Sequence, residues 1–130
     1  MKEGGPLSAR TWRFSLERTL QGDVLIVAVG GRLGFGSSGA LIESLVGAID
    51  EGHRRIVVDL LEVDYVSSAA LLALDAVAGR MHYARGHLVL CELTEPVALA
   101  FELSALAEHF SLEPTRRDAI ARAAGSAKSQ

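Results

Sequence analysis

The stretch from Arg55 to Ala84 constrains the fold most, because two different hydrophobic periodicities follow one another directly within it. It opens on the β-branched run Ile56-Val57-Val58, which is typical of a buried strand. From Ser67 the sequence becomes rich in alanine and leucine. Its larger apolar residues then recur on one helical stripe: Leu71, Leu74, Val77, Ala78 and Met81. The stretch therefore predicts a strand that ends near Leu60, a short loop, and a helix from Ser68 to about Ala84.

The rest of the chain repeats this alternation of strands and helices. The first two strands are separated by the turn signal Gln21-Gly22-Asp23 and should form a hairpin. The glycine-rich segment 30–39 should be a loop. Further strands are expected at 13–20, 24–29, 87–92 and 110–112, and further helices at 40–50, 97–106 and 115–124. Strands joined by helices need right-handed crossovers, so we expect an α/β fold with a mostly parallel sheet of four to five strands.

Composition limits the classes of function that the chain can have. Its 130 residues, 49% of them hydrophobic, suit a single globular domain. The net charge of −3 argues against non-specific binding to nucleic acid. No apolar run approaches the roughly 20 residues that cross a bilayer, and the amino terminus lacks the apolar core of a signal peptide. We therefore expect a cytoplasmic protein without direct membrane insertion. The expected organisation is a flexible amino terminus at 1–12, the domain at 13–113, and a helix with a disordered tail at 114–130.

Ser67 and Ser68 stand where the central helix should begin. A serine at this place can cap the unpaired backbone N–H groups of the first helical turn. The same N–H groups and the helix dipole can also receive an anion. A hydroxyl here is therefore either a plain helix cap or a group that can carry phosphate.

The residues around these serines resemble the signature of the STAS domain, the fold of bacterial anti-sigma factor antagonists. In that family an apolar strand ends in Asp-Leu and leads through a short segment into Ser-Ser-Ala-Gly-Leu or a close variant. Here Val58-Asp59-Leu60 and Ser67-Ser68-Ala69-Ala70-Leu71 occupy those places. The segments VLIVAVGGRL and HLVLCELTEPVALAFELSAL are similar to two further family motifs, so the resemblance covers roughly Asp23 to Leu112.

The resemblance implies a protein that works by partner switching and not by catalysis, without a cofactor. The unphosphorylated antagonist would bind an anti-sigma factor that is also a serine kinase. Phosphorylation would release it, and a PP2C-type phosphatase would restore it. The family's phosphorylated serine falls on Ser68, with Ser67 as the alternative acceptor. A homodimer is also possible, because the stripe of Phe101, Leu103 and Leu106, which should pack on the sheet, could instead serve a dimer interface.

Residues near the two serines are the expected partner-binding surface. Besides the serines, this set consists of Asp59, Asp64, Ala69, Gly34 and Ser37. Gly34 and Ser37 belong to it because loops that follow parallel strands gather at one edge of a sheet. Three positions depart from the family pattern: Ala70 replaces a glycine, Ser67 replaces a common aspartate, and Gly34 stands where many members have an acid.

Two alternatives remain at this stage. The first is a STAS subunit of a transporter or lipid-transport complex, in which the hydroxyl at Ser68 would contact a partner without a phosphorylation cycle. The second is a small nucleotide-binding domain. The segment Gly34–Gly39 matches G-x-G-x-x-G, and Asp59 lies twenty residues beyond it, where a ribose-binding acid is found in dinucleotide-binding folds.

Overall fold

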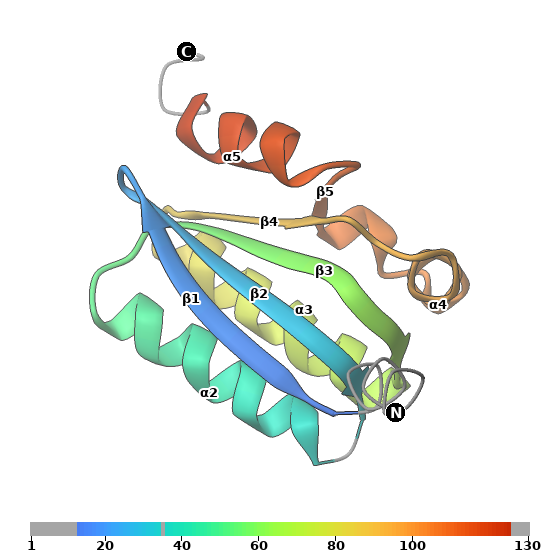
Figure 1. Cartoon of the computed structure of the whole chain (residues 1–130). Helices are drawn as coiled ribbons and strands as arrows, with labels where there is room; N and C mark the ends of the chain where they lie inside the picture. The colour runs from blue at the N-terminus through green and yellow to red at the C-terminus, as the bar shows by residue number, and fades with distance from the viewer. Residues whose placement is uncertain (1–12, 35, 126–130) are drawn as a thin grey trace, which may run out of the picture.

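A computed structural model describes residues 13–34 and 36–125 of the chain. They form a five-stranded sheet with helices on both sides (Figure 1). The strands are β1 (Ser15–Gln21), β2 (Val24–Leu33), β3 (Arg55–Val66), β4 (His87–Cys91) and β5 (Ser111–Glu113). The helices are α2 (Ser37–Asp50), α3 (Ser68–Tyr83), α4 (Glu95–Ser104), the short 3-10 helix η1 (Ala107–His109) and α5 (Arg116–Gly125).

The sheet has the strand order β1-β2-β3-β4-β5. β1 pairs with β2 in an antiparallel hairpin, and all other neighbouring strands are parallel. The predicted α/β fold with a mostly parallel sheet and an N-terminal hairpin is thus confirmed. Since each parallel connection carries a helix, the carboxyl ends of β2 and β3 lie at the same edge as the amino ends of α2 and α3.

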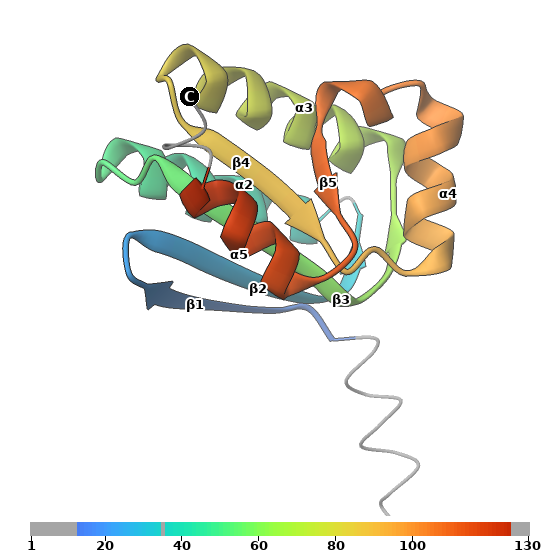
Figure 2. The same cartoon turned by 90° about the horizontal axis from the view of Figure 1, so that it is seen from above.

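Helices cover both faces of the sheet (Figures 1 and 2). Each face has its own apolar core. The larger core packs α2, α3 and α4 against one face and includes Leu45, Leu74 and Phe101. The smaller core lies under α5 on the other face. It consists of Val24, Ile26, Val57, Val89, Cys91, Ala119 and Ala123. The terminal helix therefore covers a second face of the sheet through two buried alanines.

Two strands run further than the sequence predicts. β2 was expected to end at Val29 and continues to Leu33, and β3 was expected to end at Leu60 and continues to Val66. The ladder between them has two irregularities, one between Ala28 and Gly30 and one between Gly31 and Arg32. At each irregularity β3 contributes an extra residue. This interrupts the alternation of side chains between the two faces of the sheet, on which the prediction of a strand from sequence depends.

A glycine makes the first of these extensions possible. Gly31 has φ +97°, and a Cβ at this position would lie 2.6 Å from the carbonyl oxygen of Arg13. A non-glycine residue there would be both strained and crowded. The segment that follows the predicted strand is therefore an extended part of β2 up to Leu33, and only the residues after it form the loop.

The remaining boundaries agree with the prediction to within about three residues, as expected for helix ends. The expectations for residues 1–12 and 126–130 lie outside the described residues, and Gly125 ends α5. No helix among the described residues has the length and apolar character required to span a membrane.

Candidate functional site

The candidate site lies at the edge of the sheet where β2 and β3 end and α2 and α3 begin (Figure 1). A backbone hydrogen bond ties the two strand-to-helix junctions together, since the N–H of Ser67 donates to the carbonyl of Leu33 at 2.9 Å. Residues of both junctions were expected to lie together. The structure brings Gly34, Ser37, Asp64, Ser67, Ser68 and Ala69 to this edge.

Ser67 is the N-cap of α3. Its backbone is extended, with φ −84° and ψ 164°, and its hydroxyl accepts a hydrogen bond from the N–H of Ala70 at 3.1 Å. This is the geometry in which a side chain replaces one of the hydrogen bonds that the first helical turn lacks. Ser67 is also only half-exposed. The hydroxyl of Ser67 therefore serves the helix.

Ser68 occupies the first position of α3 and is exposed. Its neighbour Ala69 is exposed as well, whereas Ala70 is buried. No hydrogen bond of the Ser68 hydroxyl to another described residue is found. The two serines thus have different tasks: Ser67 caps the helix, and Ser68 presents its hydroxyl to solvent beside the positive end of the helix dipole.

The loop from β2 to α2 is held by Ser37. Its hydroxyl donates to the carbonyl of Arg32 and accepts from the N–H of Gly34 at 3.1 Å. Gly34 lies beside Tyr65 of β3, because a methyl group at position 34 would sit 3.7 Å from Cε2 of that ring. This is an ordinary contact distance, so the glycine is not required by crowding at this place.

Arg32 and Tyr65 belong to the same edge, although the sequence analysis did not select them. The guanidinium of Arg32 lies 4.7 Å from the centre of the Tyr65 ring, within the range of a cation–π contact. The two residues are partners in the β2–β3 ladder beyond the second irregularity. Their proximity depends on that register, and no local sequence pattern signals it.

Asp59 is the predicted site residue that lies elsewhere. It is 6% exposed, and its carboxylate Oδ2 lies 2.7 Å from Nε of Arg116 in α5, on the face opposite α2 and α3. Its Oδ1 accepts the N–H of Leu61 at 2.9 Å. Asp64, in contrast, is exposed close to the end of β3. Of the two aspartates, only Asp64 is on the surface beside the serines.

The arrangement does not support a nucleotide site. β2 reaches Leu33, so Gly34 follows its strand directly, whereas the strand expected at 24–29 would leave four residues between them. However, the acid that would bind a ribose is Asp59, which is buried and engaged with Arg116. Within 13–34 and 36–125, no group of three or more His, Cys, Asp or Glu residues could hold a metal ion.

Comparisons with known proteins place the chain in a family. Residues 15–119 match the model of the STAS domain. A Bordetella bronchiseptica protein that carries the name anti-sigma factor antagonist BtrV is 36% identical over 98 residues, which cover 75% of this chain and 84% of that protein.

Solved structures of low sequence identity share the fold. An anti-sigma factor antagonist from Mycobacterium paratuberculosis superposes with a TM-score of 0.78 at 20% identity, covering 86% of this chain and 95% of that one. SpoIIAA in its unphosphorylated form gives 0.71 at 18% identity, covering 87% and 97%. The phosphorylated form of the Bacillus protein SpoIIAA gives 0.64 at 17% identity, covering 85% and 98%. With the family model and the relative in agreement over most of the chain, this protein belongs to the STAS domain family.

Proposed function

We propose that this protein is an anti-sigma factor antagonist that works by partner switching. In its unphosphorylated form it binds an anti-sigma factor that is also a serine kinase, and phosphorylation of Ser68 releases it. A PP2C-type phosphatase restores the binding form. The protein acts as a binding module in the cytoplasm and not as an enzyme.

The observation that carries the proposal is that Ser67 caps the helix while Ser68 is exposed. Because the Ser67 hydroxyl caps α3, the exposed Ser68 hydroxyl can be modified without loss of the cap. Phosphate adds a charge of roughly −1.5 to −2 at pH 7, which the amino end of a helix tolerates. Modification would thus change the surface and leave the fold intact.

The partner surface in this proposal consists of the exposed and half-exposed residues around Ser68. Asp64, Ser68 and Ala69 are exposed, and the half-exposed residues are Gly34, Ser37 and Ser67. A phosphate on Ser68 would add negative charge near Asp64. This charge would repel acidic groups of an approaching partner. If the partner stayed bound, the phosphate would lose its hydration at a large cost in free energy. Asp59 contributes indirectly, by holding α5 on the far face.

The relatives agree with this proposal. BtrV carries the name of an anti-sigma factor antagonist, and SpoIIAA has been solved in unphosphorylated and phosphorylated forms. Both the family and the geometry favour a reversible modification of one exposed serine.

The decisive experiment is intact-mass spectrometry after incubation with ATP and the anti-sigma factor kinase of the same genome, followed by peptide mapping. We expect one phosphate on Ser68 in the wild type and none in Ser68→Ala. Ser67→Ala should still be phosphorylated and serves as the matched control. Phosphate on Ser67, or none with a kinase that binds the protein, would contradict the proposal.

Binding provides the second readout. Ser68→Asp should weaken binding to the anti-sigma factor at least about tenfold, which corresponds to about 1.4 kcal/mol, whereas Ser68→Ala should retain binding and escape release by ATP. Equal binding of Ser68→Asp and the wild type would count against the switch.

A STAS subunit of a transporter complex is the alternative from a different class. It predicts that the wild type binds a membrane-protein partner with or without ATP and that Ser68 never acquires phosphate. The same mass measurement, combined with a pull-down from solubilised membranes, separates the two.

A further inference from the structure

Charged residues lie at both edges of the sheet. Where β3 and β4 begin, Arg54, Arg55 and Arg85 are found, and Arg55 pairs there with Asp23. The opposite edge, where these strands end, carries Asp64 and the start of α4, whose ten residues include two glutamates and no basic residue. Arg32 is at this edge too, with its guanidinium over the Tyr65 ring.

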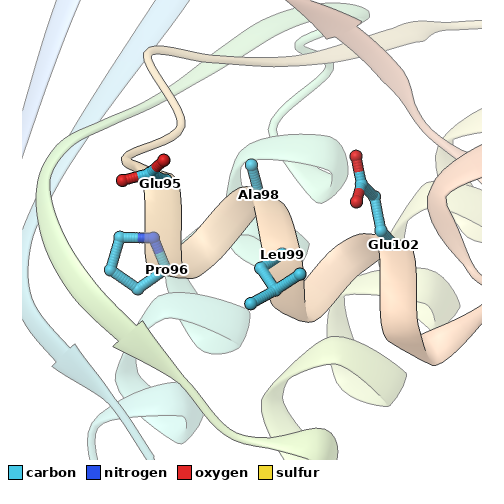
Figure 3. A pocket seen from close by; sticks show the side chains of 5 residues that line it. All are labelled: Glu95, Pro96, Ala98, Leu99 and Glu102. Carbon is cyan, nitrogen blue, oxygen red and sulfur yellow. The ribbon is translucent and has the colours of Figure 1, made fainter.

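Helix α4 presents an apolar concavity between its two acids (Figure 3). Glu95 and Glu102 line its ends, and Leu99 lies between them. Leu99 is 52% exposed, and Leu103, one turn further on, is 78% exposed. The face of α4 that turns away from the core thus combines exposed leucines with carboxylates.

Neither carboxylate is used within the described part of the chain. No hydrogen bond or ion pair of the Glu95 or Glu102 carboxylate to another described residue is found, whereas the carboxylates of Asp59 and Glu113 each bind an arginine. An exposed leucine flanked by unpaired acids contributes little to the stability of the fold itself. It is the composition expected where a partner supplies the missing apolar and cationic groups.

The concavity lies next to the candidate site. The hydroxyl of Thr94, the N-cap residue of α4, donates to the carbonyl of Val63 near the end of β3 at 2.8 Å. α4 also contacts α3. On α3, Leu72 follows Ser68 by one helical turn and is 61% exposed. Figure 2 shows α4 beside the end of β3 and the start of α3. Ser68, at the start of α3, and the α4 concavity are therefore parts of one side of the molecule.

We propose that the α4 concavity seats a cationic amphipathic segment of the same partner that recognises Ser68. Apolar side chains of that segment would cover Leu99 and Leu103, and lysine or arginine side chains would pair with Glu95 and Glu102. This inference rests on the proposed function and specifies the chemistry of the partner. The acids would repel nucleic acid and anionic lipid, which makes a protein the occupant.

The α4 concavity is too small to be a whole interface. A stable protein interface buries about 800 Å² on each partner, which exceeds what the roughly two helical turns from Glu95 to Glu102 can offer. The α4 contact is thus one part of a larger interface that also includes Ser68. Phosphate on Ser68 would weaken binding of the partner. The acids of α4 would strengthen it, because they attract a cationic segment whether or not the serine is modified.

Charge reversal tests the proposal. The double variant Glu95→Lys/Glu102→Lys should bind the purified anti-sigma factor kinase at least about tenfold more weakly than the wild type, with the difference shrinking at high salt. The matched control Glu17→Lys/Asp118→Lys makes the same change in net charge at exposed positions on β1 and α5. It should bind within about threefold of the wild type. Circular dichroism verifies that each variant is folded.

The outcomes separate the two proposals. If both double variants weaken binding equally, the effect is one of net charge and the α4 site is wrong. If Leu99→Ser/Leu103→Ser binds as well as the wild type, the apolar part of the contact is wrong. Self-association of the wild type that charge reversal abolishes would identify a second copy as the occupant and overturn the proposal. A wild type that binds no anti-sigma factor would overturn the proposed function itself.

Discussion

Nε of Arg116 lies 2.7 Å from Oδ2 of Asp59, and this ion pair joins α5 to the middle of the sheet. The Asp59 side chain is 8% exposed and that of Arg116 is 42% exposed. The backbone N–H of Arg116 also donates to Glu92 at 2.8 Å. A carboxylate that resembles a site residue in sequence thus helps to anchor the terminal helix, whose apolar contacts with the sheet come from Ala119, Ala123 and Ile120.

Removal of Arg116 should destabilise the protein. Arg116→Ala leaves the buried Asp59 carboxylate with the Leu61 N–H as its hydrogen-bond donor among the described residues, and we expect a loss of about 1–3 kcal/mol in the free energy of unfolding. Urea denaturation measures this loss. Arg122→Ala is the control, because Arg122 lies on the same helix but its pair with Glu113 of β5 is more exposed, and its loss should cost less than about 1 kcal/mol. Equal losses of unfolding free energy in the two variants would show that the Arg116–Asp59 pair stabilises the fold no more than an exposed ion pair does.

The two serines should differ in their effect on stability. Ser67→Ala removes the hydroxyl that accepts from Ala70 and should lower the free energy of unfolding by about 1 kcal/mol. Ser68→Ala removes an exposed hydroxyl and should change it by less than about 0.5 kcal/mol. Thermal unfolding of both variants checks this difference. A larger loss for Ser68→Ala would mean that Ser68 also supports the helix.

Cys91 should react slowly with alkylating reagents in the folded protein. It is buried beneath α5, and burial, with the nearby Asp59 and Glu92 carboxylates, raises the pKa of its thiol from 9.0 to about 12. At pH 8 the rate of labelling by iodoacetamide should therefore be set by how often α5 detaches from the sheet or the whole protein unfolds. Arg116→Ala should label faster than the wild type. Fast labelling of the wild type would show that α5 does not protect the thiol.

The same thiol predicts a change of stability in alkaline solution. Because the pKa of Cys91 is higher in the folded protein, the unfolded thiol ionises first as the pH rises. Its contribution is complete below pH 9.0 and is lost progressively as the pH rises from there toward about 12. The difference in unfolding free energy between wild type and Cys91→Ala should shrink over this range. An unchanged difference would contradict the raised pKa.

Two glycines should respond to alanine in opposite ways. Gly31→Ala places a Cβ at positive φ and 2.6 Å from the carbonyl oxygen of Arg13, so we expect a loss of about 2 kcal/mol or more. Gly47 is inside α2 with open space around it, and Gly47→Ala should stabilise the protein by about 0.5–1 kcal/mol. Melting temperatures of the two variants test both signs. If Gly31→Ala were neutral, the close approach to Arg13 would be wrong.

The order of helices and strands was predictable because it depends on local periodicity. The β-branched run at 56–58 and the stripe of leucines and valines after Ser68 encode their elements without reference to the rest of the chain. The N-cap at Ser67 was predictable for the same reason, since a cap needs only a hydroxyl and the next helical turn. The mostly parallel sheet then follows from the helices between the strands, which require crossover connections.

The ends of β2 and β3 and the environment of Asp59 were decided by the tertiary structure. Irregular pairing shifts the register of two strands that are about thirty residues apart, and it brings Arg32 over Tyr65. Asp59 finds its partner 57 residues away, on a helix that packs on the other face of the sheet. The sequence by itself determined which elements form and where Ser68 begins a helix, because those choices are local. Which acids are buried and which remain on the surface depends on contacts between distant segments, and only the folded chain contains them.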